Sequence, residues 1–244
     1  MKGFERAYLV LEPFLPALYR HVRRELLAAA RRSPTQVLDL LDVGGRKSHY
    51  TVGVPASVTI SDLPRESAVQ RELNLGLTDS MIAQLQMRRS NVRHVVLDDM
   101  TRSTLPTSSF DIVVAVEVLE HVEQDETFVR EVARVLKPHG AFIMTTPNGD
   151  AVPVPGNSDH KRHYHAAALR ALLASHFQVV DVRYAIVNSV FRTAGLEPWS
   201  VRKPVRTAFS MLGNLVSGFE SSRRLERARP LATRHLIACC RRDV

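Results

Sequence analysis

The stretch LPTSSFDIVVAVEVLEHVEQDETFVREVARVLKPHGAFIMTTPN, residues 105–148, decides the fold. Within it, residues 110–118 form the most apolar of the predicted strands, which is typical of a strand that is buried on both faces. Residues 125–137 have the apolar spacing of an amphipathic helix, and a proline and a glycine follow it. A second apolar run covers 141–148. The order strand, helix, strand predicts two parallel strands joined by a crossover helix.

The same alternation extends on both sides of this unit. Further strands are predicted over 36–45, 57–62, 92–99, 177–187 and 232–242, and helices over 4–31, 78–88, 165–176 and 205–218. Pro13 and Pro16 are expected to break the first of these helices. Strands that alternate with helices predict an α/β fold of the Rossmann-like, doubly wound kind, with a mostly parallel sheet. The last two strands lack a regular crossover, which predicts an antiparallel last strand.

This pattern divides the chain into four parts. We expect an N-terminal helical extension, a ligand-binding core, an insertion that serves as a substrate lid, and a last strand that returns to the core sheet. Their expected limits are 1–35, 36–187, 188–231 and 232–244.

Composition excludes several classes of protein. The chain has 244 residues, of which 45% are hydrophobic, enough for one domain with a sizeable core. No apolar run approaches the ~18 residues that a membrane-spanning helix needs, and the N-terminus lacks the features of a secretory signal. The two cysteines, Cys239 and Cys240, cannot form a disulfide framework or a zinc site alone. These features predict a cytoplasmic protein.

The net charge of +8 is unevenly distributed. Residues 37–191 carry 15 Lys and Arg against 18 Asp and Glu, whereas residues 192–244 carry 11 against 4. The basic ends could attract an anionic partner, or they could simply be a solvated surface, and we favour the solvated surface. The insertion combines apolar and basic residues. It could cover an apolar acceptor, lie on a membrane surface, or pack on the sheet or a second subunit, and we slightly favour this packing.

The carboxyl ends of the predicted strands carry the candidate ligand-binding residues. In an open α/β sheet, ligands bind outside these ends, near the switch in strand order. Gly44 and Gly45 follow the first strand and have no Cβ, so the backbone can turn sharply there and approach a ligand. Asp62, at the end of the second strand, can accept hydrogen bonds from ribose hydroxyls. An acid after the third strand can accept from an adenine amine, and Leu63 and Met100 can enclose a purine. Together these residues predict an adenosine pocket. The chain has no motif for a dinucleotide pyrophosphate or a triphosphate.

These segments resemble the class I S-adenosylmethionine-dependent methyltransferases. The similarity rests on DVGG at 42–45, SD at 61–62, DDM at 98–100 and above all on 105–148. It covers about residues 36–187, and the most similar branch acts on small molecules such as quinones, sugars, lipids and natural products. The resemblance implies a seven-stranded sheet with an antiparallel last strand. It also implies S-adenosylmethionine as cofactor and S-adenosylhomocysteine as product.

The resemblance also implies a role for each strand-end residue. Asp42, Gly44 and Gly45 would lie against the amino-acid part of the cofactor, and Asp62 would hold the ribose. Asp99 would face the adenine amine, with Asp98 as its substitute. The remaining cofactor contacts would come from Leu63, Met100, Glu117 and Val118.

The glycine motif departs from the family pattern. It reads DVGGRKS, so that Arg46 and Ser48 occupy positions where the family has glycines. One interpretation is that Gly45 makes the turn and Arg46 meets the cofactor carboxylate. The other, which we favour less, is that the pocket has lost its cofactor.

Candidate catalytic residues follow the fifth strand. If the acceptor is a hydroxyl, a base must take its proton, and His160, His163 and, third, His121 are the candidates. Each of these histidines could instead be structural. Tyr164 and Asn148 are expected to contact the substrate. The sequence shows no metal-ligand set, so no metal is expected.

The sequence therefore predicts an enzyme, a methyltransferase that methylates a small molecule, with oxygen as the expected acceptor atom. One alternative is a non-catalytic relative that binds an anionic partner. Another is a nucleic-acid methyltransferase, although the chain has no recognisable nucleic-acid module and no nucleic-acid partner is expected.

Overall fold

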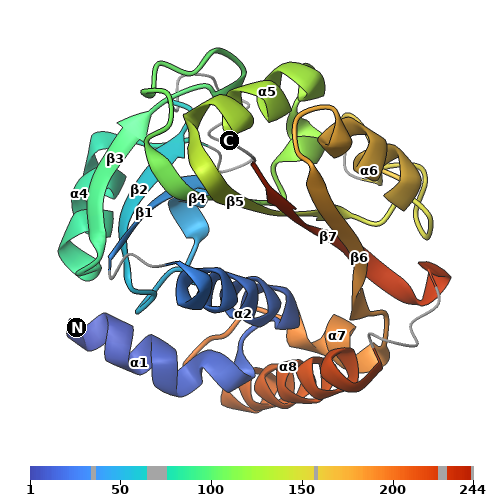
Figure 1. The fold of residues 1–244 in the computed structure, drawn as a ribbon. Coiled ribbons are helices and arrows are strands. Elements are labelled where there is room, and N and C mark those ends of the chain that lie inside the picture. The colour runs from blue at the N-terminus through green and yellow to red at the C-terminus, as the bar shows by residue number, and fades with distance from the viewer. Residues whose placement is uncertain (34–36, 65–75, 157–158, 225–229, 243–244) are drawn as a thin grey trace.

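A seven-stranded sheet forms the centre of the computed structural model (Figure 1). The structure describes residues 1–244 except 34–36, 65–75, 157–158, 225–229 and 243–244. The strands are β1 (Leu38–Val43), β2 (Ala56–Asp62), β3 (Val92–Leu97), β4 (Phe110–Val116), β5 (Leu136–Pro147), β6 (Val179–Val187) and β7 (Thr233–Arg241). Their order in the sheet is β3-β2-β1-β4-β5-β7-β6.

The direction of the strands confirms the predicted fold class. β1 pairs in parallel with β2 and β4, and β4 pairs in parallel with β5. β7 is antiparallel to both β5 and β6, between which it lies. The strand order reverses at β1, because the chain adds β2 and β3 on one side of it and β4 on the other. This reversal places a topological switch point between β1 and β4.

The described helices lie on both faces of the sheet (Figure 1). They are α1 (Gly3–Leu11), α2 (Ala17–Arg32), α4 (Asp79–Arg88), α5 (Asp125–Val135), α6 (Ala166–Ala174), α7 (Val190–Gly195) and α8 (Pro204–Arg224). The predicted break between the first two helices is confirmed, since a short 3-10 turn at Glu12–Phe14 separates them. None of the helices in the described part of the chain has both the length and the hydropathy that crossing a bilayer requires.

Two hydrophobic layers hold the helices to the sheet. Val22 and Leu26 of α2 pack with Leu40 of β1 on one face. On the other face, Phe128 of α5 and Leu169 of α6 belong to the second core cluster. Because both faces are covered, the central strands are largely apolar, which is why they appear in the sequence as short apolar stretches.

The strand β5 differs from its prediction. It begins at Leu136, directly after α5, whereas the sequence predicted a helix to 137 and a strand from 141. Phe110 pairs with Leu136, but Ile112 pairs with Ala141, so the register shifts between them. The residues in between form an irregularity in the strand, and His139 there has a φ of 63°. The proline and glycine in this segment therefore shape a distorted strand rather than a loop.

The helix α8 faces the protein with its polar side. Ser210, Asn214 and Ser217 are buried, and Asn214 Nδ2 donates to the carbonyl of Gly195 in α7 at 2.8 Å. The large apolar side chains of α8 are exposed instead, namely Val205, Phe209, Leu212, Leu215 and Phe219. This orientation is the reverse of what an amphipathic helix normally adopts on a protein core.

Candidate functional site

The turn after β1 brings three strand ends into contact. Gly44 has a φ of 68°, a region that favours glycine, and its N–H donates to the carbonyl of Ser61 at 2.8 Å. A Cβ on Gly44 would lie 2.8 Å from Cγ2 of Val118, which follows β4. The loops after β1, β2 and β4 therefore meet at the switch point, as the sequence predicted for the ligand site.

Asp42 lies under this turn and is fully buried. Its carboxylate accepts hydrogen bonds from the hydroxyls of Ser48 and of Tyr50, the latter at 2.8 Å. A Cβ on Gly45 would lie 2.4 Å from Cγ of Asp42, so only glycine fits there. Burial raises the pKa of Asp42 to about 6, although the two hydroxyls lower it. Ser48 and Tyr50 were not among the predicted site residues. Ser48 stands at a family glycine position and supports the buried acid.

Arg46 and Asp62 lie side by side at the end of β2. Nε of Arg46 is 4.0 Å from Oδ2 of Asp62, and both side chains are largely buried. The N–H of Leu63 donates to Oδ1 of Asp62 at 2.8 Å. The guanidinium of Arg46 thus lies next to the carboxylate that is expected to bind ribose. The side chain of Leu63, the next residue, is exposed.

The two acids after β3 have different surroundings. Asp99 caps a short 3-10 helix, because its Oδ1 accepts from the N–H and hydroxyl of Thr101, and its Oδ2 lies 3.2 Å from Arg102. Asp98 uses Oδ1 to accept from Thr104. Its Oδ2 is buried and has no hydrogen-bond partner among the described residues. Met100 is buried in the core cluster.

Glu117, directly after β4, has a φ of 55° and faces β5 and β7. Its carboxylate accepts from the hydroxyl of Thr145 at 2.9 Å and lies 3.3 Å from Nδ1 of His235. Burial alone would raise the pKa of Glu117, but the charge of His235 and these hydrogen bonds outweigh it and lower the pKa. Thr145 and His235 were not predicted, because His235 comes from a strand more than a hundred residues further along the chain.

All three candidate catalytic histidines gather beside the end of β4. The rings of His121 and His160 have centroids 4.7 Å apart, and Nδ1 of His160 is 2.9 Å from Nε2 of His163. Nδ1 of His163 lies 2.6 Å from the carbonyl of Val152. Burial, and then the neighbouring His121 and His163, lower the pKa of His160. The structure thus brings together residues that the sequence placed in two separate segments.

Glu120 completes this cluster and was not predicted as a site residue. Its side chain is fully buried, Oε2 accepts from the hydroxyl of Thr146 at 3.1 Å, and burial followed by the charge of Glu117 raises its pKa well above the usual value. Glu120, His121 and His160 each offer a ligand atom, and these atoms lie within 4.8 Å of one another. This set differs from the expectation of no metal-ligand set. In the sequence only the adjacent Glu120 and His121 could have signalled this set, because His160 joins them through the fold.

The two residues expected to contact substrate have structural partners. Asn148 is buried, and its Nδ2 donates to the carbonyl of Pro230 at 2.8 Å and to Thr233. Tyr164 is also buried, and its hydroxyl donates to Asp125 at 2.7 Å. These bonds hold both side chains to the protein itself, and their contact with a substrate stays a prediction.

Known methyltransferases are similar to this chain in sequence. A family described as a methyltransferase domain matches residues 51–144. A protein of Mycolicibacterium smegmatis named a probable S-adenosylmethionine-dependent methyltransferase is 34% identical over 140 residues, which are 54% of this chain and 51% of that protein. The ubiquinone biosynthesis O-methyltransferase of Xanthomonas oryzae is 34% identical over 122 residues, 50% of this chain and 45% of that one. The chain thus spans about half the length of these curated relatives.

Solved structures show the same fold. One is a Burkholderia thailandensis 1,6-didemethyltoxoflavin-N1-methyltransferase, solved with S-adenosylhomocysteine. Its TM-score is 0.54 at 15% identity, and the match covers 93% of this chain and 79% of that protein's chain. A Haemonchus contortus phosphoethanolamine N-methyltransferase, solved with S-adenosyl-L-methionine, has a TM-score of 0.57 at 15% identity over 91% of this chain and 53% of its own.

The buried acid under the turn predicts a pH dependence of stability. The folded pKa of Asp42, about 6, exceeds the ordinary value of 3.8, so the fold favours the protonated form. This contribution is complete below about pH 4 and is lost as the pH rises through about 6. We expect the free energy of unfolding of the wild type to fall relative to Asp42→Asn over this range. Urea unfolding of both proteins measures it, and a difference that stays constant with pH contradicts it.

Proposed function

We propose that this chain, which has the fold of the class I S-adenosylmethionine-dependent methyltransferases and contains a matching methyltransferase domain, transfers a methyl group from S-adenosylmethionine to an oxygen of a small-molecule acceptor. The observation that carries the proposal is the meeting of the glycine turn, Asp62 and Glu117 at the switch point. This is the position where sheets of this topology bind nucleotides. The relatives named as S-adenosylmethionine-dependent methyltransferases support the choice of cofactor.

The proposed cofactor site follows the strand ends. Asp62 would accept the ribose hydroxyl hydrogens, and the Gly44–Gly45 turn would pass close to the amino-acid part. Asp98 would accept from the adenine amine, because its Oδ2 is buried and has no hydrogen-bond partner among the described residues, whereas both oxygens of Asp99 already have partners. Arg46 would turn from Asp62 toward the cofactor carboxylate when ribose binds.

The chemistry requires little from the protein besides positioning. The acceptor oxygen forms a bond to the methyl carbon while the carbon–sulfur bond breaks, and the electron pair of that bond stays on sulfur. The hydroxyl must also lose its proton. We propose that the nitrogen lone pairs of His121 and His160 face the acceptor and assist this loss, since their cluster adjoins Glu117 at the expected methionine end.

The flanking helices supply the walls of the acceptor site in this proposal. Tyr19 of α2 and Arg192 of α7 both interact electrostatically with Glu117, so residues from both flanks lie near the strand ends. Nη2 of Arg192 is also 3.3 Å from His235. We therefore propose that the described residues of the parts 1–35 and 188–231 enclose the acceptor, as expected of a lid.

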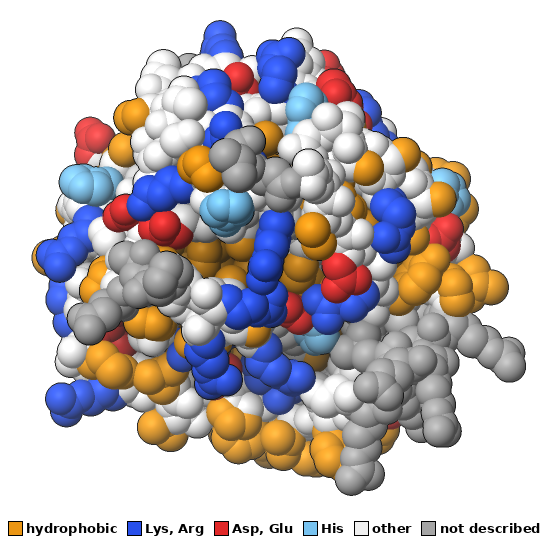
Figure 2. Space-filling view, in the orientation of Figure 1, with side chains coloured by type: hydrophobic (Ala, Val, Ile, Leu, Met, Phe, Trp, Pro, Cys, Tyr) orange, Lys and Arg blue, Asp and Glu red, His pale blue; other side chains and the backbone are white. Residues whose placement is uncertain are grey.

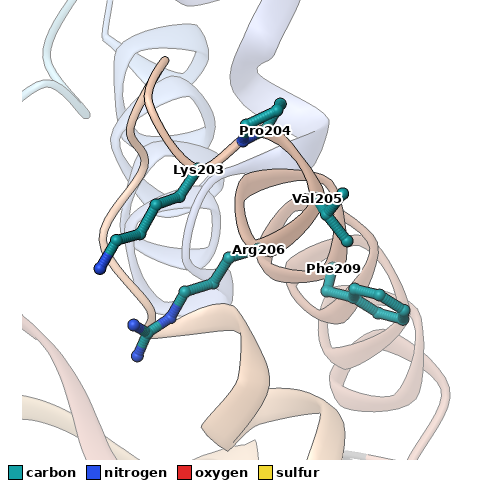
Figure 3. Close-up of a pocket in the computed structure, with 5 residues that line it drawn as sticks. All are labelled: Lys203, Pro204, Val205, Arg206 and Phe209. Atoms are coloured by element: carbon teal, nitrogen blue, oxygen red, sulfur yellow. The ribbon is translucent and has the colours of Figure 1, made fainter.

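We further propose that the acceptor is lipid-linked and that α8 lies on an anionic membrane surface. The apolar side chains of α8 form an exposed face at the lower edge of the molecule, and Phe209 is 67% exposed (Figures 1 and 2). A hollow of about 490 Å³ is lined by the first turn of this helix. In Figure 3, Lys203 and Arg206 extend to one side of the turn, while Val205 and Phe209 point to the other.

The charge of the insertion agrees with a membrane partner. Residues 188–231 carry eight Lys and Arg against three Glu. An apolar face with basic residues beside it matches the acyl and headgroup zones of an anionic bilayer, because lysine can extend its ammonium to the headgroups while its stem stays apolar.

One observation favours a second candidate function. Arg46 lies where the family has a glycine, and it neighbours the acid that should hold ribose. A non-catalytic relative that binds an anionic partner would retain such a pair, since nothing needs to displace the guanidinium.

Cofactor binding distinguishes the two functions. We expect wild-type protein to bind S-adenosylhomocysteine in calorimetry and Asp62→Ala to lose about 1.5–3 kcal/mol, more than about tenfold in affinity. Asp181→Ala, an exposed acid on β6, is the matched control and should bind like the wild type. Unchanged affinity in Asp62→Ala contradicts the site, and absence of binding in the wild type favours the second candidate.

Vesicle binding tests the α8 surface. We expect the wild type to sediment with phosphatidylglycerol vesicles, and Phe209→Ser combined with Phe219→Ser to bind at least about tenfold more weakly, because two apolar side chains no longer enter the bilayer. Met87→Ser, an exposed apolar residue on α4, is the control. If the wild type ignores vesicles but forms a dimer that the double variant loses, the face binds a second copy instead.

A further inference from the structure

Glu120, His121 and His160 meet at the carboxyl edge of the sheet. Glu120 and His121 belong to the 3-10 turn Leu119–His121 after β4, and His160 lies in the segment after β5. Because β4 and β5 are parallel neighbours, their following segments emerge at the same edge. One ligand atom from each side chain lies within 4.8 Å of the other two. In a metal site with bonds of about 2.0–2.2 Å, ligand atoms are about 3–3.5 Å apart, so small side-chain movements would close the set.

Hydrogen bonds leave one nitrogen of each histidine free as a ligand. Nδ1 of His121 lies 3.0 Å from Oδ2 and 3.2 Å from the carbonyl oxygen of Asp159. Both are acceptors, so Nδ1 carries the hydrogen and Nε2 of the neutral ring has the lone pair. A carboxylate that accepts from a histidine is the usual support of a metal-bound imidazole.

Two successive hydrogen bonds determine which nitrogen of His160 carries the hydrogen. The carbonyl of Val152 can only accept, so Nδ1 of His163 donates to it at 2.6 Å. Nε2 of His163 is then the acceptor of its ring, and Nδ1 of His160 donates to it at 2.9 Å. Nε2 of His160 therefore has a lone pair too. Two imidazoles are held in the tautomer that binds a cation, and the supporting bonds come from residues outside the cluster.

Glu120 provides an independent indication of a ligand. Its side chain has no exposed surface, and Oε2 accepts from Thr146. Oε1 is buried and has no hydrogen-bond partner among the described residues. A buried carboxylate oxygen without a donor is costly, because it has lost water and gained nothing in return. A cation at this position would satisfy it.

We propose that Glu120, His121 and His160 bind a divalent transition-metal cation of the zinc type. Two imidazoles and one carboxylate are a ligand set that such cations prefer, and magnesium and calcium prefer oxygen ligands alone. Three protein ligands leave at least one coordination position open, which is typical of a catalytic rather than a structural site.

The role of the cation rests on the proposed function. An acceptor hydroxyl oxygen in the open position would lose its proton to water more readily, because a bound cation lowers the pKa of oxygen ligands. The oxygen then keeps the electron pair that forms the bond to the methyl carbon. In this arrangement His121 and His160 assist proton loss as ligands and do not accept the proton themselves.

Metal binding is tested on the full chain without cofactor or acceptor. We expect calorimetry to show one Zn²⁺ per wild-type chain, and Co²⁺ to give the visible absorption of a nitrogen- and oxygen-ligated ion. Glu120→Gln and His160→Ala should each abolish tight binding. The matched control is His165→Ala, because His165 is exposed in the same segment and pairs with Asp150 outside the cluster. Equal Zn²⁺ affinity in all four proteins overturns the proposal, as does a preference for Mg²⁺.

A variant outside the cluster tests the site without removing a ligand. Asp159→Asn should lower Zn²⁺ affinity by about 10–100-fold, since the support of His121 weakens. Thermal unfolding of each variant identifies loss of fold. The two proposals fail separately: S-adenosylhomocysteine binding without Zn²⁺ binding overturns only the metal site, and Zn²⁺ binding without S-adenosylhomocysteine binding overturns only the methyltransferase function.

Discussion

The close approach of the Gly44–Gly45 turn to its neighbours is the constraint on which the site depends. A side chain at Gly44 would meet Val118, and one at Gly45 would meet the carboxyl group of Asp42. Because both positions lack a Cβ, the loops after β1, β2 and β4 can come together at the switch in strand order. Asp62 and Glu117 lie at the ends of β2 and β4, the parallel neighbours of β1, and so emerge at the same edge of the sheet. The proposed cofactor site lies at this switch point, whose position the backbone fixes.

Charge is arranged around this turn in three zones. Acids lie at the strand ends, histidines lie in the segments that follow β4 and β5, and basic residues are concentrated in the insertion. The net charge of +8 therefore says little about the ligand of the core, whose segment 37–191 carries more acids than bases. The positive charge belongs to the outer surface near α8. This helix exposes Phe209 and Phe219 and buries Ser210 and Asn214 against the protein. The metal proposal and the membrane proposal concern different zones and stand on different observations.

Much of the fold could be predicted because local patterns and packing agree. Short, largely apolar stretches identified the strands, since strands covered on both faces need few polar residues. The start of β5 could not be predicted, because it depends on the pairing of Leu136 with Phe110 and on a register shift that no local pattern encodes. The apolar spacing of α8 was visible, but the sequence does not say which side of a helix faces the core. Only the bond from Asn214 to Gly195 and the burial of Ser210 show that the polar side does.

The sequence by itself determined the order of strands and helices along the chain, the glycine turn and the acids at the strand ends. It also determined the resemblance to one family of enzymes. These are local features, and each is complete within a few neighbouring residues. The tertiary structure decided which of them meet. It paired Glu117 with His235 across the sheet, placed Arg46 beside Asp62, and set Glu120 and His121 against His160. Such contacts depend on pairing between distant strands, and for that reason the proposed ligand set at Glu120 became visible only in the folded chain.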